Sequence, residues 1–327
     1  MHKSLTQALK ARSSLISDNH AAAIRLFNGF YEGYPNLVVD LYARTLILFG
    51  YEKSSPKMME FMGAAQNLLL EQLPWVNCVV HKQRFAPDRR LRRGVLRFGD
   101  KPAEKIEEHG IWYAIDSLMN QDASFYLDTR NLRKWLLDNA SGWKVMNTFA
   151  YTGSLGVAAL AGGAARVIQS DRNRKFLELA RTSGMLSHLD IGKMKLRTAN
   201  FFTQVAQLKH NGELFDCLII DPPFFSSTKK GNVDLVNDYV RIINKVRPLV
   251  KDGGRLIAIN NALFLSGAEY MSSLEQLCAD GYLSIETIIP VPQDITGYSQ
   301  TIVDAPPRDP APFNHPTKIA ILGVRRK

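Results

Sequence analysis

The sequence has few cysteines and arranges neither them nor its histidines as a metal site. Three cysteines, Cys78, Cys217 and Cys278, occur in 327 residues, with no CxxC pair and no close Cys/His spacing. Disulfide-rich domains carry more cysteines in a shorter chain, and zinc sites need more closely spaced Cys and His ligands. The seven histidines are scattered along the chain. We therefore expect free thiols and no metal.

Long apolar runs are also missing. No window approaches 18 uninterrupted apolar residues, and the first 20 residues carry scattered basic side chains without an apolar core. A membrane-spanning helix needs about 20 apolar residues, and a secretory signal needs an apolar core behind a basic start. The sequence therefore predicts a cytoplasmic protein that does not span a membrane.

Two common nucleotide-binding motifs are absent as well. After the first strand predicted in the second half of the chain, only Gly153 and Gly156 are present, so the GxGxxG spacing of dinucleotide-binding folds is incomplete. The phosphate-binding motif GxxxxGK[ST] does not occur either. Both absences disfavour, without excluding, an enzyme that uses a nicotinamide dinucleotide or a nucleoside triphosphate.

The composition is that of a globular chain with a basic surplus. Hydrophobic residues make up 46% and charged residues 22%, so the chain can bury a core large enough for two domains. The formal net charge of +10 favours a polyanionic partner through non-specific attraction. Because the surplus is spread along the chain, only local clusters can indicate a binding surface.

The order of strand and helix patterns changes along the chain. Residues 21–52 alternate β-rich segments with turn formers, and a helix with proline in its first turn follows at 56–73. From residue 143 strands and helices alternate regularly, which requires a mostly parallel, doubly wound sheet. We predict a small α+β domain over 1–118 and an α/β domain over 119–327. Its strands are expected at 144–149, 166–170, 194–198, 217–220, 255–260, 284–291 and 318–324.

A basic run follows the strand predicted at 76–81. Seven lysines and arginines lie within sixteen residues, with Phe85 and Phe98 at the edges. Such a run either contacts RNA phosphates or is a solvated, mobile loop of a basic protein. The residues predicted to bind RNA here are Lys82, Arg84, Arg89, Arg90, Arg92 and Arg93.

The apolar run at 217–220 stops at the tetrapeptide Asp221-Pro222-Pro223-Phe224. Proline cannot donate to a ladder, so the strand must end at Asp221 with a rigid turn at its carboxyl end, where open α/β sheets bind ligands. Asp221 and the turn carbonyls can hold the amino edge of a base, and Phe224 can stack on it. We predict Asp221, Pro222, Pro223 and Phe224 as the catalytic group. The alternative is a strand end followed by a hydrophobic loop.

Three more strand ends carry candidate ligand residues. In the loop at 149–153, Gly153 lets the backbone pass close to a ligand. Asp171 stands where an acid reaches ribose hydroxyls, although it can equally cap a helix. Asn200 can pair with an adenine edge and Phe201 can cover the ring, although an asparagine here can also be a turn residue.

These strand ends together resemble the class I S-adenosylmethionine-dependent methyltransferases over roughly residues 120 to 327. Three stretches, QDASFYLDTR at 121–130, NTFAYTG at 147–153 and DPPFFS at 221–226, look like the bacterial large-subunit (23S) ribosomal RNA methyltransferases acting at cytosine-5 or guanine-7. The resemblance implies a Rossmann-like, seven-stranded, mostly parallel sheet with an antiparallel last strand, a preceding RNA-associated domain, and S-adenosyl-L-methionine as cofactor.

The resemblance also extends the set of cofactor residues. In that family the stretch like 125–130 helps to hold the methionine end of the cofactor, which would give Arg130 a carboxylate partner; Asp128 can otherwise be a helix N-cap. Asn200 departs from the family, which usually has an acid there. The predicted cofactor-binding residues are Phe125, Asp128, Arg130, Phe149, Tyr151, Thr152, Gly153, Asp171, Arg172, Asn200 and Phe201.

We predict an enzyme that transfers a methyl group from S-adenosylmethionine to a base in RNA, in particular large-subunit ribosomal RNA. Methylating carbon 5 of a pyrimidine generally needs a cysteine thiolate, and Cys217 lies four residues before Asp221, inside a strand. We therefore expect transfer to nitrogen, with guanine-7 first and an amino group second. The alternatives are a catalytically silent RNA-binding or ribosome-assembly protein, a methyltransferase acting on a small molecule or protein, and a nicotinamide enzyme.

Two loops have open interpretations. The loop at 226–232 contains Lys229 and Lys230, which either contact RNA phosphates, as we predict, or belong to a plain flexible loop. The segment at 290–316 contains seven prolines. It either shapes the access of the substrate or is a surface excursion without a role.

Overall fold

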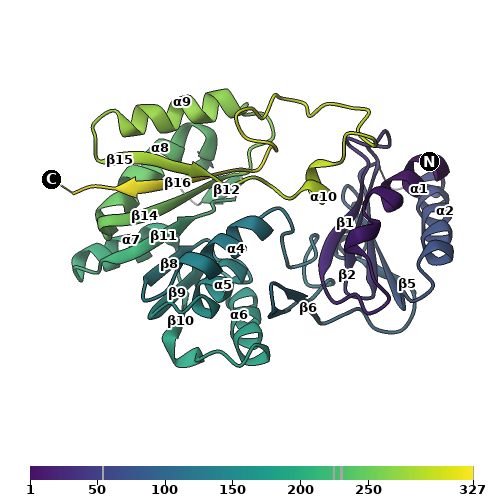
Figure 1. Cartoon of the computed structure of the whole chain (residues 1–327), viewed down its shortest axis with the longest axis horizontal. Helices are drawn as coiled ribbons and strands as arrows, with labels where there is room; N and C mark the ends of the chain where they lie inside the picture. The colour runs from purple at the N-terminus through teal and green to yellow at the C-terminus, as the bar shows by residue number, and fades with distance from the viewer. Residues whose placement is uncertain (54, 224, 229–230, 327) are drawn as a thin grey trace. The chain divides into compact units, whose positions relative to one another are not determined.

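The computed structural model describes residues 1–53, 55–223, 225–228 and 231–326. The chain forms two compact units (Figure 1). Unit 1 comprises Met1–Asp128 and Pro292–Pro306, and unit 2 comprises Thr129–Val291 and Pro307–Lys327. Residues 119–128 and 292–306 thus group with the smaller unit, whereas the sequence analysis assigned them to the α/β domain.

Unit 2 is built on a seven-stranded sheet with the order β10-β9-β8-β11-β14-β16-β15. Neighbouring strands are parallel from β10 through β14, while β16 runs antiparallel to β14 and to β15. This arrangement confirms the predicted Rossmann-like fold class. The strands are β8 (Lys144–Thr148), β9 (Arg166–Asp171), β10 (Met194–Thr198), β11 (Phe215–Ile220), β14 (Val250–Asn260), β15 (Leu283–Ile288) and β16 (Lys318–Val324).

Helices cover both faces of this sheet, which is why its central strands are apolar on both sides. One face packs on α7 (Phe201–His210), α8 (Leu235–Val246) and α9 (Gly267–Cys278). The other packs on α4 (Arg130–Asn139) and α5 (Ser154–Ala161), with α6 (Arg174–Leu186) beside α5 (Figure 1). Smaller elements are η2 (Ile191–Lys193), the hairpin of β12 (Phe225–Thr228) and β13 (Gly231–Asp234), and η3 (Arg247–Leu249). No helix in the described ranges is both long and apolar enough to cross a membrane.

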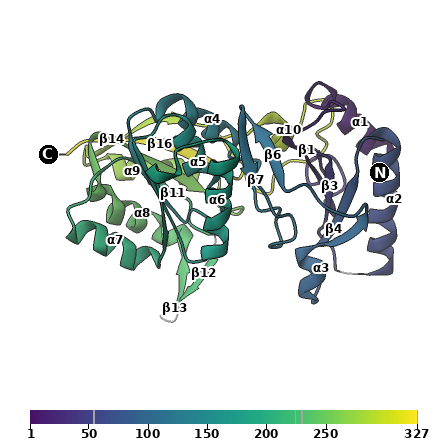
Figure 2. The same cartoon turned by 90° about the horizontal axis from the view of Figure 1, so that it is seen from below.

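Unit 1 contains a five-stranded sheet with the order β1-β2-β3-β4-β5, in which only β3 and β4 pair in parallel. Its strands are β1 (Ala23–Asn28), β2 (Leu37–Tyr42), β3 (Thr45–Gly50), β4 (Cys78–Gln83) and β5 (Val95–Phe98). Helices α1 (His2–Ala11) and α2 (Pro56–Gln72) share a hydrophobic core with the sheet (Figure 2). The unit also holds η1 (Ser13–Leu15), α3 (Arg89–Arg93), and a hairpin of β6 (Lys105–Glu108) and β7 (Ile111–Ala114).

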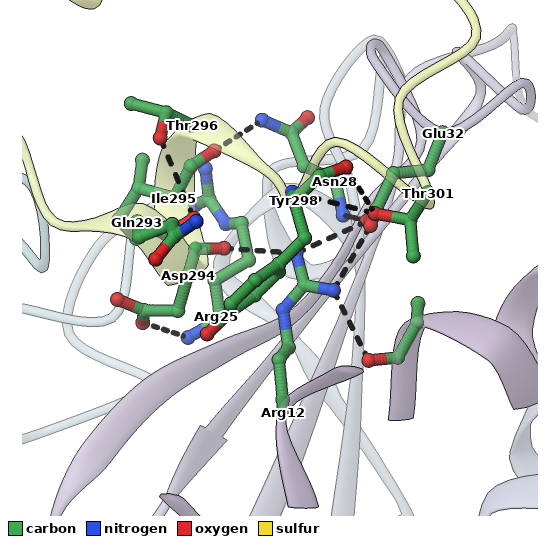
Figure 3. A network of polar contacts seen from close by, with 11 residues as sticks. Arg12, Arg25, Asn28, Glu32, Gln293, Asp294, Ile295, Thr296, Tyr298 and Thr301 are labelled. Atoms are coloured by element: carbon green, nitrogen blue, oxygen red, sulfur yellow. Dashed lines mark hydrogen bonds and ion pairs between the residues drawn. The ribbon is translucent and has the colours of Figure 1, made fainter. Parts of the chain in front are cut away.

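A segment from near the end of the chain completes unit 1. Residues 292–306 contain the short helix α10 (Gln293–Thr296), which packs against β1. The fully buried Arg12 donates to both carboxylate oxygens of Glu32 at 2.9 and 3.2 Å, and to the carbonyl oxygen of Asp294 at 3.0 Å (Figure 3). The Asp294 carboxylate accepts from the backbone N–H of Arg25 at 3.0 Å. Buried charges are tolerated only when paired in this way, so this part of the proline-rich segment is a structural element of unit 1.

Candidate functional site

The carboxyl ends of four neighbouring strands of unit 2 lie at one edge of its sheet. Thr198 at the end of β10 is opposite Asp171 at the end of β9, and Thr148 of β8 is opposite Ile220 of β11. Because these strands are parallel, the loops that follow them emerge side by side. The structure therefore brings the predicted loop at 149–153 to the same edge as Asp171, Asn200 and Asp221.

The loop after β8 has an uncommon backbone conformation. Phe149 and Tyr151 have φ values of 53° and 51°, in the left-handed region that aromatic residues rarely adopt, and Gly153 follows at 76°. Two backbone bonds hold the loop, from the N–H of Ala150 to Ser170 O at 2.9 Å and from Gly153 N–H to Ala150 O at 2.7 Å. Such strain persists where the surroundings fix it, and it clusters at ligand sites.

Asp171 holds this loop against the start of the next one. Its Oδ2 accepts from the backbone N–H of Tyr151 at 2.9 Å, and its Oδ1 accepts from Asn173 N–H at 2.9 Å. Burial raises the pKa of Asp171, and these hydrogen bonds to its charged form oppose the rise. Asn173, and not Asp171, caps α6. Each carboxylate oxygen has a second lone pair with which it can accept from a ligand; the neighbouring Arg172 is exposed.

A buried pair of amides holds the loop at the Gly153 carbonyl oxygen. The sequence patterns did not indicate this pair. Asn147 Nδ2 donates to Gln169 Oε1 at 2.8 Å, and Gln169 Nε2 donates to the Gly153 carbonyl oxygen at 2.8 Å. A Cβ on Gly153 would lie 2.7 Å from Gln169 Nε2 and 2.5 Å from Ala180 Cβ. The side of Gly153 on which a Cβ would lie is thus filled by protein, so packing by itself requires glycine here. The predicted close approach of a ligand to the loop backbone stays a prediction. In both strands the amide directly follows two buried apolar residues, and this position was the available signal.

Two aromatic rings meet beside Asn200. The Phe149 and Phe201 rings stack with centroids 4.6 Å apart and planes at 25°, and Phe201 is 8% exposed. Phe202, the next residue, is 40% exposed. The Oδ1 of Asn200 accepts from Phe202 N–H at 3.0 Å, so Asn200 caps α7. Thr152, also predicted to bind the cofactor, is buried.

Two buried tyrosines that sequence patterns did not single out, Tyr239 and Tyr270, lie near Asp221 in the turn after β11. Asp221 is half-buried, Pro222 is buried and Pro223 is exposed. The Tyr270 hydroxyl donates to Tyr239 Oη at 3.1 Å, and the Tyr239 hydroxyl donates to the carbonyl oxygen of Ile259 at 3.0 Å. Burial raises the pKa of both phenols, and the nearby charge of Asp221 raises it further. Phe224, Lys229 and Lys230 lie outside the described residues.

The stretch at 121–130 is divided between the two units. Phe125 is buried in unit 1, where its ring lies 5.0 Å from that of Tyr113 between centroids. Asp128 is half-buried at the end of unit 1, and Arg130 is the first residue of α4 in unit 2. The N-cap of α4 is Thr129, one residue later than the alternative considered for Asp128.

The predicted phosphate contact at Lys82 needs correction. Strand β4 carries this side chain into unit 1, where it is fully buried. Its Nζ donates to the carbonyl oxygens of Arg93 and, at 2.8 Å, of Asn120. Burial lowers the pKa of Lys82 to about 7. Lys82 therefore ties the chain segments together and does not contribute to an exposed basic surface.

The other basic residues of this run are at least partly exposed. Arg84 and Arg92 are half-buried, while Arg89, Arg90 and Arg93 are exposed. Arg84 donates to the Gln121 carbonyl oxygen at 2.7 Å, and Arg93 donates to that of Met119 at 3.1 Å. Arg90 forms a 3.0 Å ion pair with Asp88, which also caps α3. Helix α3 thus presents arginines on the surface of unit 1.

The thiols are poorly placed for chemistry at the strand ends. Cys78 lies buried in unit 1, and Cys217 is buried within β11. Cys278 is partly buried at the end of α9. Burial raises the pKa of all three thiols above the ordinary value. Among the residues that the structure describes, no group of three or more His, Cys, Asp or Glu side chains could hold a metal ion.

Comparison with known sequences identifies relatives over most of the chain. The family model of the S-adenosylmethionine-dependent methyltransferases matches residues 29–279. The ribosomal RNA large subunit methyltransferase I of Aeromonas salmonicida is 28% identical over 286 residues, which cover 85% of this chain and 70% of that protein. The enzyme of the same name from Aliivibrio fischeri is 25% identical over 293 residues, covering 88% and 72%.

Solved structures share the fold at lower sequence identity. SMU.776, solved in complex with SAH, superposes with a TM-score of 0.84 at 21% identity, covering 99% of this chain and 80% of that one. The tRNA m1G37 methyltransferase of M. jannaschii has a TM-score of 0.55 at 15% identity, covering 100% and 79%. The match to the family model over most of the length, on a sheet of this topology, establishes that the chain belongs to the S-adenosylmethionine-dependent methyltransferases, enzymes whose cofactor is the S-adenosylmethionine that the motifs predicted.

Proposed function

We propose that this enzyme methylates a base of large-subunit ribosomal RNA at a nitrogen atom, with guanine N7 as the first candidate and an amino group as the second. One observation carries the proposal. A single sheet edge in unit 2 gathers the strained loop at 149–153, Asp171 and the turn Asp221-Pro222-Pro223. The class of RNA comes from the relatives, which are named as ribosomal RNA large subunit methyltransferases.

The residues at this edge fit the cofactor. Asp171 has a half-buried carboxylate that can accept from ribose hydroxyls, and its backbone partners hold it in place. Asn200 uses its oxygen as a helix cap, so its amide nitrogen is the group that can donate to an adenine. We assign Arg130 to the carboxylate of the methionine end and Tyr151 and Thr152 to the surrounding wall. The burial of Phe125 inside unit 1 argues against a direct contact for it.

The substrate base is held by the turn after β11. When bound, S-adenosylmethionine supplies a methyl group on a sulfonium that carries its own leaving group, so the protein mainly has to align the base and exclude water. Asp221 and the carbonyls of the proline turn accept from the amino edge of the base. Pro222 and Pro223 fix φ, which keeps these acceptors in one orientation.

The cysteines favour nitrogen over carbon. A ring or amino nitrogen has its own lone pair and needs only positioning, whereas carbon 5 of a pyrimidine needs a thiolate to add first. Burial disfavours the thiolate form at all three positions. Asn260, in the region where cytosine-5 members of the family carry cysteine, is buried, and its Oδ1 accepts from Ala262 N–H at 2.9 Å.

The proposal is tested by mapping methylated nucleotides in RNA from cells with and without this enzyme. We expect one 7-methylguanine in large-subunit ribosomal RNA to disappear without the enzyme, to return with the purified wild type, and to return more slowly with Asp221→Ala. Removing this acceptor should lower kcat/KM by about 5- to 160-fold, corresponding to about 1–3 kcal/mol. Loss of 5-methylcytosine instead would contradict the choice of nitrogen. An unchanged methylation map would favour a silent RNA-binding protein or another substrate.

A further inference from the structure

Three aromatic side chains gather at one end of the sheet in unit 1. Phe30 follows β1, Tyr51 follows β3 and Phe85 follows β4. These three strands run in the same direction, since β1 and β3 are each antiparallel to β2 and β3 pairs in parallel with β4. The aromatic residues therefore leave the sheet at the same end. The Tyr51 ring lies 4.8 Å from that of Phe30 and 6.4 Å from that of Phe85, in edge-to-face pairs.

These rings face water to an extent that core packing does not explain. Phe30 is 41% exposed, Phe85 is 64% exposed and Tyr51 is half-buried. Their backbones are nevertheless held: Tyr51 N–H donates to Asn36 O, and Arg84 N–H donates to Gly50 O, both at 2.9 Å. A row of exposed aromatic rings on an ordered backbone is a feature of a binding surface.

Positive charge lies directly beside the rings. The guanidinium of Arg84 is 5.8 Å from the centre of the Tyr51 ring. The side chain of Arg92 in α3 donates to the carbonyl oxygens of Ala86 and Pro87 at 2.7 and 2.8 Å, which ties the arginine helix to the loop that carries Phe85. Sites for single-stranded nucleic acid combine aromatic rings, on which bases stack, with arginines, which donate to phosphates.

We propose that Phe30, Tyr51 and Phe85 form a stacking platform for unpaired bases of a single-stranded RNA segment, whose phosphates Arg84 and the arginines of α3 hold. This inference rests on the proposed function, in that RNA is taken to be the substrate. The charge of the surface favours a polyanion over a neutral protein partner. Because every base has a stacking face, the platform would bind with little sequence preference and would reject a fully paired duplex.

The test compares Phe85→Ala with the wild-type chain. The probe is a single-stranded RNA of about eight nucleotides with a central 2-aminopurine, within the length that such sites cover. Binding to the wild type should quench the fluorescence, because the base stacks. Phe85→Ala should bind about 5- to 100-fold more weakly, and Phe85→Trp should restore binding. The dependence of affinity on salt should stay that of the wild type, because the phosphate contacts remain.

Two controls make the result specific. Phe98, 43% exposed, pairs with Val79 near the start of β4, at the other end of the same sheet, so Phe98→Ala should bind like the wild type. The double variant Arg89→Ala/Arg90→Ala should lower the salt slope by about 0.7 per lost phosphate contact. Equal affinities of Phe85→Ala and the wild type, or an equal loss on a paired duplex, would overturn the platform. Failure of the wild type itself to bind any RNA would instead overturn the proposed function.

Discussion

His81 and Lys82 are neighbours on β4 and both are buried, but their side chains differ in whether they form hydrogen bonds. Lys82 donates to two carbonyl oxygens. Neither ring nitrogen of His81 has a hydrogen-bond partner within the described residues. Burial, reinforced by the charge of Arg97, lowers the pKa of His81 to about 4. His81 is therefore a neutral core residue, and its protonation opposes folding.

This residue should make unit 1 sensitive to acid. The unfolded chain protonates His81 near pH 6.5 and the folded chain only near pH 4, so the unfolded state binds more protons in between. Stability should fall as the pH is lowered from 6.5 to 4, by up to about 3 kcal/mol from this group. We expect His81→Leu to lose less stability than the wild type in urea unfolding between pH 7 and pH 4.5. The exposed His210→Gln is the control, and equal pH dependences in His81→Leu and the wild type would contradict the assignment.

Asp171 illustrates a residue with two tasks. It fixes the strained loop through Tyr151 N–H, and it is proposed to accept from the cofactor. Asp171→Ala should weaken S-adenosylmethionine binding by about 1–3 kcal/mol in calorimetric titration, because polar partners are left unsatisfied. Asp190→Ala removes a carboxylate that caps η2 elsewhere in unit 2 and should leave the affinity unchanged. A wild-type affinity in Asp171→Ala would remove Asp171 from the cofactor site.

Among the elements, the segment at 292–306 stands out because it is far in sequence from the unit it completes. Its anchor, Arg12, is fully buried between Glu32 and the backbone of α10 (Figure 3). The hydroxyphenyl ring of Tyr298 lies 5.1 Å from the Arg12 guanidinium carbon, which adds a cation–π contact. The stability of unit 1 should therefore depend on residues near both ends of the chain.

Breaking this ion pair on one side should be more damaging than removing it entirely. Arg12→Met leaves the Glu32 carboxylate buried without its cation, which we expect to cost about 3–5 kcal/mol in chemical unfolding. The double variant Arg12→Met/Glu32→Leu should lose less free energy of unfolding, because it leaves no unpaired charge in the buried site. Arg174→Ala, which breaks the exposed pair with Glu178, should cost about 1 kcal/mol or less. If Arg12→Met were no less stable than Arg174→Ala, the network would not anchor the segment.

For the whole molecule, our two proposals assign methyl transfer to unit 2 and RNA recognition to unit 1. Unit 2 carries the strand-end site, and unit 1 carries the arginines of α3 and the exposed aromatic rings. The cysteines are distributed over both units, and burial raises the pKa of each thiol. A mechanism that needed a thiolate would have to recruit one of these three groups.

Removing the thiols should therefore leave the reaction intact. We expect the triple variant Cys78→Ala/Cys217→Ala/Cys278→Ser to keep kcat/KM within about threefold of the wild type, since a group that never meets the substrate stabilises no transition state. Methyl transfer to RNA is measured alongside a folding check by circular dichroism. Single variants at each position show whether any loss comes from packing. A folded triple variant without activity would overturn transfer to nitrogen.

Several features followed from the sequence because they depend on short-range patterns. The alternation of apolar strands and helices after residue 143 predicted the correct fold class. The two prolines after Asp221 predicted a strand end at Asp221, and β11 ends one residue earlier, at Ile220. The motifs at 147–153 and 221–226 led to the family that the comparisons confirmed. The edge where these strand ends meet follows from parallel topology alone. Which residues contact the cofactor remains a prediction.

Tertiary structure alone decided which polar side chains are buried and which distant groups they bond to. Lys82 belonged to a basic run by sequence, but its burial depends on the Asn120 carbonyl far along the chain. The amides of Asn147 and Gln169 pair across neighbouring strands, and Arg12 finds its partners in Glu32 and in α10. Periodicity reports which face of an element is apolar; it carries no information about which distant polar group completes a buried hydrogen bond. Only the folded chain brings these buried polar groups together, so their pairing could not be predicted from the sequence.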